Sequence, residues 1–136
     1  GFTNIKTGIM NTVKSLQEIN IAFINDKSPI IDLISNDLLN FGIDILFRSE
    51  NITNGLSQLS TLKKLPKTAI IDLDFYDENV LEQLQELKAK YPTIRLIAHS
   101  DIDDIETAKI LSEIGVESHL LIGSDADDFK RAIEKV

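Results

Sequence analysis

The chain has 136 residues, a net charge of −8 and no cysteine, and 43% of its residues are hydrophobic. This length and composition are typical of a single soluble globular domain. The lack of cysteine excludes disulfides and thiolate metal sites and fits the reducing cytoplasm, where we expect the protein. The excess of acids argues against direct binding to nucleic acid, because clustered basic side chains hold phosphate backbones. No apolar run approaches the ~18 residues of a membrane span, and the first residues lack a secretory pattern.

Short apolar runs alternate with amphipathic segments along most of the chain. The runs predict five strands, at 19–25, 43–47, 68–72, 93–100 and 117–123. Apolar residues at helical spacing predict five helices, at 28–42, 53–65, 79–90, 101–115 and 124–136. Ser28 is a candidate N-cap for the first helix, and Ser124 or Asp125 for the last. Gly115 is a candidate helix stop.

Strands that alternate with helices predict an α/β protein with a parallel sheet and helices on both faces. For five such units we expect the flavodoxin-like order 2-1-3-4-5, with right-handed crossovers. Ligands of these sheets bind outside the carboxyl ends of the strands, where the strand order reverses. Asp26 follows the first strand and Asp72 ends the third, so we expect the two to converge.

Residues 1–18 precede this pattern. Ile5, Ile9, Val13 and Leu16 form a weak helical stripe. We expect either a docked or dimerising helix or a mobile leader. The predicted organisation is therefore an N-terminal extension at 1–18 and one domain at 19–136.

Four segments resemble the receiver domain of two-component response regulators over residues 19–136. They are IAFINDKSPI, AIIDLDFYDEN, LIAHSD and GVESHLLIGSD. In that family two acids after strand one hold Mg²⁺, and an Asp ending strand three accepts a phosphoryl group. A Ser or Thr ending strand four contacts the phosphate, and a lysine after strand five pairs with it.

The resemblance implies a role for each matching position. The metal ligands would be Asn25, Asp26 and Asp72, the phosphoacceptor Asp72, the phosphate-reading hydroxyl Ser100, the switch aromatic His119, and the lysine position Ile122. From the residues alone, Ser100 is equally a candidate cap of the next helix, and Asp74 either faces solvent or lines the rim of the site. His99 and His119 are expected at the surface or half-buried.

The sequence departs from the family pattern at several of these positions. Ile122 stands where the lysine would neutralise the acyl phosphate, and Asn25 replaces one carboxylate of the metal pair. Tyr76 and Val80 replace a proline and a glycine that usually follow the phosphoacceptor. Phosphoryl transfer depends mostly on electrostatic stabilisation. We therefore expect phosphorylation of Asp72 to be impaired or absent, and Mg²⁺ binding to be weak or absent.

These observations predict an atypical receiver in phosphorelay signalling, and not an enzyme. GVESHLLIG is similar to the run in receivers fused to LuxR-type helix-turn-helix domains, with its lysine lost. We therefore expect regulation of a transcriptional output domain through protein–protein contact, with DNA binding confined to that domain. The expected partners are a sensor kinase, the output domain or a second copy of the chain.

Two alternatives stay open. The first is an active, Mg²⁺-dependent receiver that uses Asp72 as phosphoacceptor. The second is a phosphatase, since IIDLDF resembles the haloacid-dehalogenase motif, with Asp72 as nucleophile and Asp74 as acid or base. That family carries its motif on the first strand of the core, whereas two strand–helix units precede it here.

Overall fold

The structure, a computed structural model, describes residues 19–26, 28–73 and 78–135. Its strands are β1 (Asn20–Ile24), β2 (Asp44–Arg48), β3 (Thr68–Asp72), β4 (Arg95–Ser100) and β5 (Val116–Leu121). Its helices are α2 (Ile30–Asn40), α3 (Ile52–Thr61), α4 (Glu78–Lys90), α5 (Ile105–Ile114) and α6 (Ala126–Glu134). The predicted extension at 1–18, and Asp74 and Tyr76, lie outside the described residues.

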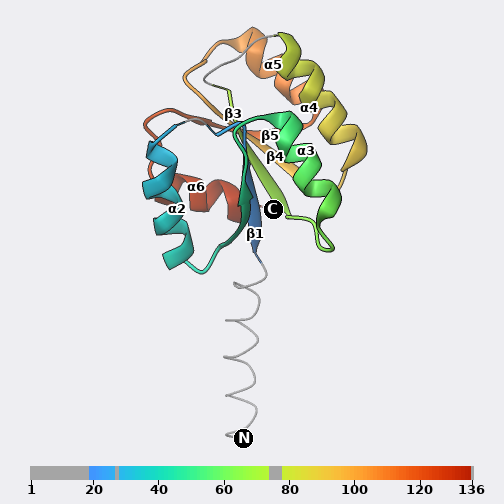
Figure 1. Cartoon of the computed structure of the whole chain (residues 1–136). Coiled ribbons are helices and arrows are strands. Elements are labelled where there is room, and N and C mark those ends of the chain that lie inside the picture. The colour runs from blue at the N-terminus through green and yellow to red at the C-terminus, as the bar shows by residue number, and fades with distance from the viewer. Residues whose placement is uncertain (1–18, 27, 74–77, 136) are drawn as a thin grey trace, which may run out of the picture.

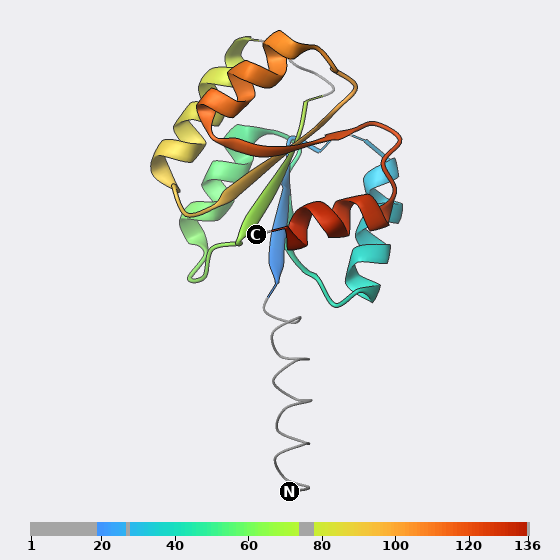
Figure 2. The same ribbon diagram turned by 180° about the vertical axis from the view of Figure 1, so that it is seen from behind.

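The five strands form one parallel sheet in the order β2-β1-β3-β4-β5, which confirms the predicted flavodoxin-like fold (Figure 1). Helices α2 and α6 cover one face, and α3, α4 and α5 cover the other, as the view from behind also shows (Figure 2). None of the described helices is both long and apolar enough to cross a membrane.

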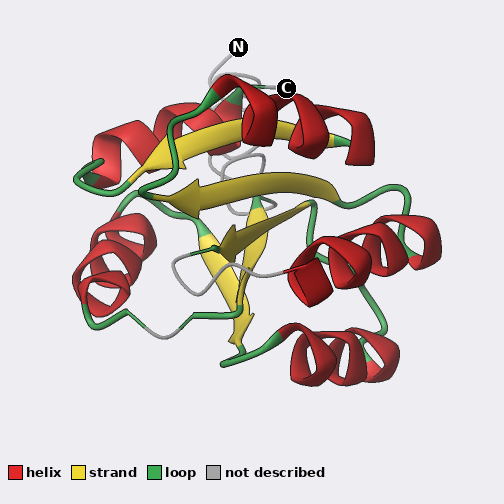
Figure 3. Ribbon diagram, turned by 90° about the horizontal axis from the view of Figure 1, so that it is seen from above, coloured by secondary structure: helices red, strands yellow, loops and turns green. Residues whose placement is uncertain are grey.

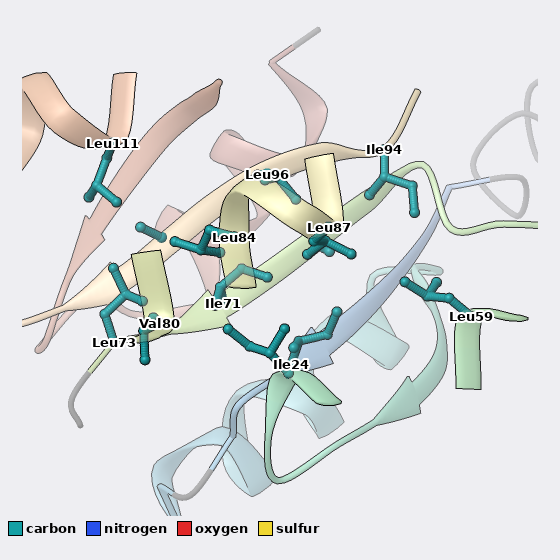
Figure 4. Close-up of a cluster of buried hydrophobic side chains, with 13 residues drawn as sticks. Ile24, Leu59, Ile71, Leu73, Val80, Leu84, Leu87, Ile94, Leu96 and Leu111 are labelled. Carbon is teal, nitrogen blue, oxygen red and sulfur yellow. The ribbon is translucent and has the colours of Figure 1, made fainter. Parts of the chain in front are cut away.

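The central strands are buried on both faces, so their apolar side chains supply two separate clusters. Ile71 of β3 packs with Leu84 and Leu87 of α4 in the first cluster (Figure 4). The neighbouring Ile70 points to the opposite face, where it packs with Phe129 of α6 in the second cluster. Consecutive residues of one strand thus hold different helix layers against the sheet.

The helix ends confirm two of the predicted capping residues and contradict one. Asp125 caps α6, and it forms a reciprocal pair of hydrogen bonds with Asp128. Gly115 ends α5 in the left-handed region, with φ of 112°. The predicted capping role of Ser28 is wrong, because Pro29 occupies the N-cap position of α2 and no side chain makes a capping hydrogen bond there. Ser28 instead accepts a bond from the N–H of Ile31 through its backbone carbonyl, at 3.2 Å.

Candidate functional site

The carboxyl ends of β1, β3 and β4 bring the predicted polar residues to one edge of the sheet, the edge viewed in Figure 3. Asp72 is the last residue of β3, and it is buried. The side-chain nitrogen of Asn25 donates a hydrogen bond to the backbone carbonyl of Asp72 at 2.6 Å. The ends of β1 and β3, distant in sequence, are therefore in direct contact.

The backbone conformation of Asn25 is unusual, and it explains the direction in which the side chain of Asn25 points. Its φ of 59° lies in the left-handed region, which Asn adopts more readily than most residues that carry a Cβ. The next residue, Asp26, donates its backbone N–H to the carbonyl of Ser49 at 2.8 Å. The segment after β1 is thus bonded to β3 on one side and to the end of β2 on the other.

Arg48, the last residue of β2, places a cation against Asp26. Its Nε and Nη2 atoms each lie 2.7 Å from Oδ2 of Asp26. Its Nη1 atom lies 2.7 Å from Oδ1 of Asp32, in the first turn of α2. Partial burial alone would lower the pKa of Arg48, but hydrogen bonds and charge from the two carboxylates outweigh it and raise the pKa. Arg48 is therefore charged at every physiological pH.

Arg48 is not among the residues predicted for the site. No motif marks it, but a signal existed in the predicted strand order. β2 neighbours β1, so a basic residue at the carboxyl end of β2 must lie beside the acid that follows β1.

Ser100 ends β4 and is completely buried. Its Oγ lies 2.6 Å from Nε2 of His119 on β5, and the N–H of Ile102 donates to the same oxygen at 3.2 Å. The cap of α5 is Asp104, so Ser100 does not cap that helix. Its hydroxyl is instead bonded to the half-buried His119, the position that the resemblance assigns to the switch aromatic.

Ile122 directly follows β5 at the position where the resemblance expects lysine. Its backbone N–H donates to the carbonyl of Ser100 at 2.9 Å, and its side chain is 42% exposed. The end of β5 therefore lies beside the end of β4, but it presents an apolar group there and no charge.

His99 was expected at the surface or half-buried, and this is wrong. Its side chain is 2% exposed, and its ring packs edge-on against Phe129 with a centroid distance of 5.0 Å. It belongs to the face of β4 that α6 covers.

Mg²⁺ prefers an octahedron of hard oxygens, usually including one or two carboxylates. The residues around Asp26 do not fit it. One carboxylate oxygen of Asp26 already accepts two N–H groups of Arg48, and the other accepts the N–H of Ser28 at 3.3 Å. The amide nitrogen of Asn25 is bonded to a backbone carbonyl. In the described ranges no three acidic or His side chains form a group suited to a metal ion.

No protein-family model matches the chain, and no curated protein matches its sequence. Solved structures match at low identity. A response regulator receiver domain protein from Methanospirillum hungatei is 16% identical, with a TM-score of 0.73 over 85% of this chain and 90% of that one. A putative pilus assembly-related protein from Burkholderia pseudomallei is 15% identical, with a TM-score of 0.73 over 88% of this chain and 89% of that one.

The RcsB response regulator from Salmonella typhimurium is 16% identical, with a TM-score of 0.70 over 85% of this chain and 56% of RcsB. These matches agree with the strand order and with the helix layers described above. The chain therefore has the fold of response-regulator receiver domains.

Proposed function

We propose that the chain is an atypical receiver domain that signals through protein–protein contact, with phosphorylation of Asp72 impaired or absent. The proposal rests on the residues at the ends of β4 and β5, which would contact the phosphate in a working receiver. Ile122 supplies no cation there, and the hydroxyl of Ser100 is already bonded to His119. An acyl phosphate on Asp72 would add negative charge to a buried acid without the lysine that stabilises it in the family.

The Ser100–His119 bond also opposes the switching movement of a working receiver. In that movement the strand-four hydroxyl turns towards the phosphate, and the strand-five aromatic follows it inward. Here the hydroxyl would first have to break a 2.6 Å bond to His119 and release the N–H of Ile102. The net cost of losing a typical hydrogen bond is about 0.5–1.5 kcal/mol.

Exposed apolar residues supply a candidate contact surface. Ile105 of α5 is 88% exposed, and Ile110 of α5, Leu121 of β5 and Ile122 are also exposed. A partner protein, such as an output domain, a sensor kinase or a second copy, would bury these side chains. We place the protein in the cytoplasm, where these partners act, and assign DNA binding to an output domain.

The burial of Asp72 at the end of a central strand favours one second candidate, an active phosphoacceptor. The two functions differ in one measurement. The chain is incubated with Mg²⁺ and acetyl phosphate, and its intact mass is recorded beside that of Asp72→Asn. We expect no gain of a phosphoryl group in either protein. A gain in the wild type that Asp72→Asn lacks would replace our proposal with the active receiver.

Signalling through protein–protein contact is tested independently by a binding experiment. Ile105→Asp adds a charge to the exposed apolar surface, and we expect its stability to change by less than about 0.5 kcal/mol. The purified chain and this variant are each titrated with a candidate output domain or analysed for self-association by sedimentation. Binding that Ile105→Asp leaves intact would exclude this surface as the contact.

A further inference from the structure

The end of β2 joins two acids through one side chain. Arg48 contacts Asp26 through Nε and Nη2 and Asp32 through Nη1, each at 2.7 Å. The side chain of Asp26 is 3% exposed, whereas that of Asp32 is 67% exposed. Arg48 therefore connects an exposed acid on α2 with a buried acid at the carboxyl end of the sheet. Asp26, the buried acid, depends on Arg48 for its counter-charge.

A buried carboxylate needs both a counter-charge and hydrogen bonds. Asp26 receives the counter-charge and two charge-assisted bonds from Arg48, and one further bond from the N–H of Ser28. The planar fork of the guanidinium lets it serve both carboxylates at once, which a lysine cannot do. Groups of the chain itself therefore supply both the counter-charge and the hydrogen bonds of the Asp26 carboxylate.

The same contact fixes the segment after β1. Asp26 bonds to the carbonyl of Ser49 through its backbone and to Arg48 through its side chain. Both bonds lead to consecutive residues at the end of β2. This segment is therefore held against β2 at two points, and each point is independent of any added ion.

We propose that Arg48 is the resident cation of this site, replacing a divalent metal as the counter-charge of Asp26 and fixing the segment after β1. The inference rests on the proposed function for the assignment of Asp26 to the receiver pocket, and it specifies how the pocket is charged. A divalent cation at the same carboxylate oxygen would face the guanidinium at contact distance, and the two positive charges repel. Mg²⁺ therefore binds only when Arg48 is removed.

The test is a magnesium titration of four proteins: the wild type, Arg48→Gln, Asp26→Asn and the double variant. Melting temperature and amide NMR shifts are recorded without metal and with millimolar MgCl₂. We expect no response at Asp26 or Ser49 in the wild type. In Arg48→Gln we expect Mg²⁺ affinity to rise about tenfold or more and Tm to increase with metal. The double variant loses that response.

Without metal, the four proteins also form a double-mutant cycle. We expect Arg48→Gln and Asp26→Asn each to lower Tm by about 5 °C. The loss of Tm in the double variant should be smaller than the sum of the two single losses, because both substitutions remove the same interaction. Arg95→Gln, which breaks a partly exposed pair with Glu117 on another strand, is the matched control. It leaves the magnesium response unchanged.

Two results would overturn the inference. One is equal Mg²⁺ affinity in the wild type and Arg48→Gln, including the case in which neither responds. The other is additive losses of Tm in the cycle. If Arg48→Gln does not fold, Arg48→Met, which also removes the charge, takes its place in the titration and in the cycle. Arg48→Lys tests the shape of the side chain separately. Lysine keeps the charge without the fork, so a smaller loss of Tm is expected, and no loss at all would contradict the role of the fork.

These outcomes are separate from those of the proposed function. Phosphoryl uptake by the wild type refutes the proposed function, whatever the Arg48 variants do. Magnesium binding by the wild type without phosphoryl uptake refutes only the role of Arg48.

Discussion

Phe129 is expected to control the docking of α6 on the sheet. Its ring is fully buried, 5.0 Å from the ring of His99 and 6.5 Å from that of Phe23 between centroids. The other buried residues of α6 are Ala126 and Ile133. Truncation of a buried Phe to Ala costs about 3–5 kcal/mol. For a domain of this size that loss lowers Tm by about 15 °C and removes a large part of a typical stability of ~5–15 kcal/mol.

The assay is urea unfolding followed by circular dichroism, with hydrogen exchange of α6 measured by mass spectrometry. Phe129→Leu is the matched control, since it keeps most of the volume, and it should cost about 1–2 kcal/mol. We expect Phe129→Ala to expose the amides of α6 well before those of β1. A loss below about 1 kcal/mol, or equal losses in the two variants, would refute the reasoning that this ring anchors the helix.

Three further outcomes follow from bonds and backbone angles. Ser100→Ala removes the bond to His119 and should cost about 1–2 kcal/mol in urea unfolding, and a change below ~0.5 kcal/mol would contradict this. Gly115→Ala forces a Cβ into the left-handed region, and a loss of about 1–2 kcal/mol is expected in the same assay. The backbone N–H of Thr107 lowers the pKa of Asp104, so this contribution is present above about pH 4 and is lost as pH falls through the lower folded pKa. As pH is lowered through the acid range, Tm should therefore fall less steeply in Asp104→Asn than in the wild type. An equal dependence of Tm on pH in the two proteins would exclude Asp104 as a source of the acid sensitivity.

The fold was predictable because each level of the sequence agreed with the next. The strand runs, the helix periodicity and the crossover rule together led to one topology, and the sheet has that order. The same order and the rule for the carboxyl ends of strands predicted that Asp26 would converge with Asp72. In the structure the neighbouring Asn25 makes the contact with Asp72, and the side chain of Asp26 pairs with Arg48 instead.

The remaining features depend on contacts that a linear pattern does not encode. β4 is buried on both faces, so the sequence gives no alternation that tells which layer His99 faces. Arg48 acquires its role only through the pairing of β2 with β1, and charged residues at strand ends are usually left in water. Ser28 does not cap α2 because the helix begins at Ile30, so that Pro29 occupies the cap position. The carbonyl of Ser28 still accepts a hydrogen bond from the first turn.

The division of the core by the sheet has a consequence for local unfolding. One layer contains α2 packed on α6, and the other contains α3, α4 and α5 packed in sequence. Each layer has its own buried cluster, so the layers are expected to open as two cooperative units in native-state hydrogen exchange. Among the described residues, the layer of two helices has fewer buried apolar groups to lose, and we expect it to open at the lower free energy. A partner that binds α6 would then raise the protection of α2, with little change in α3 or α4.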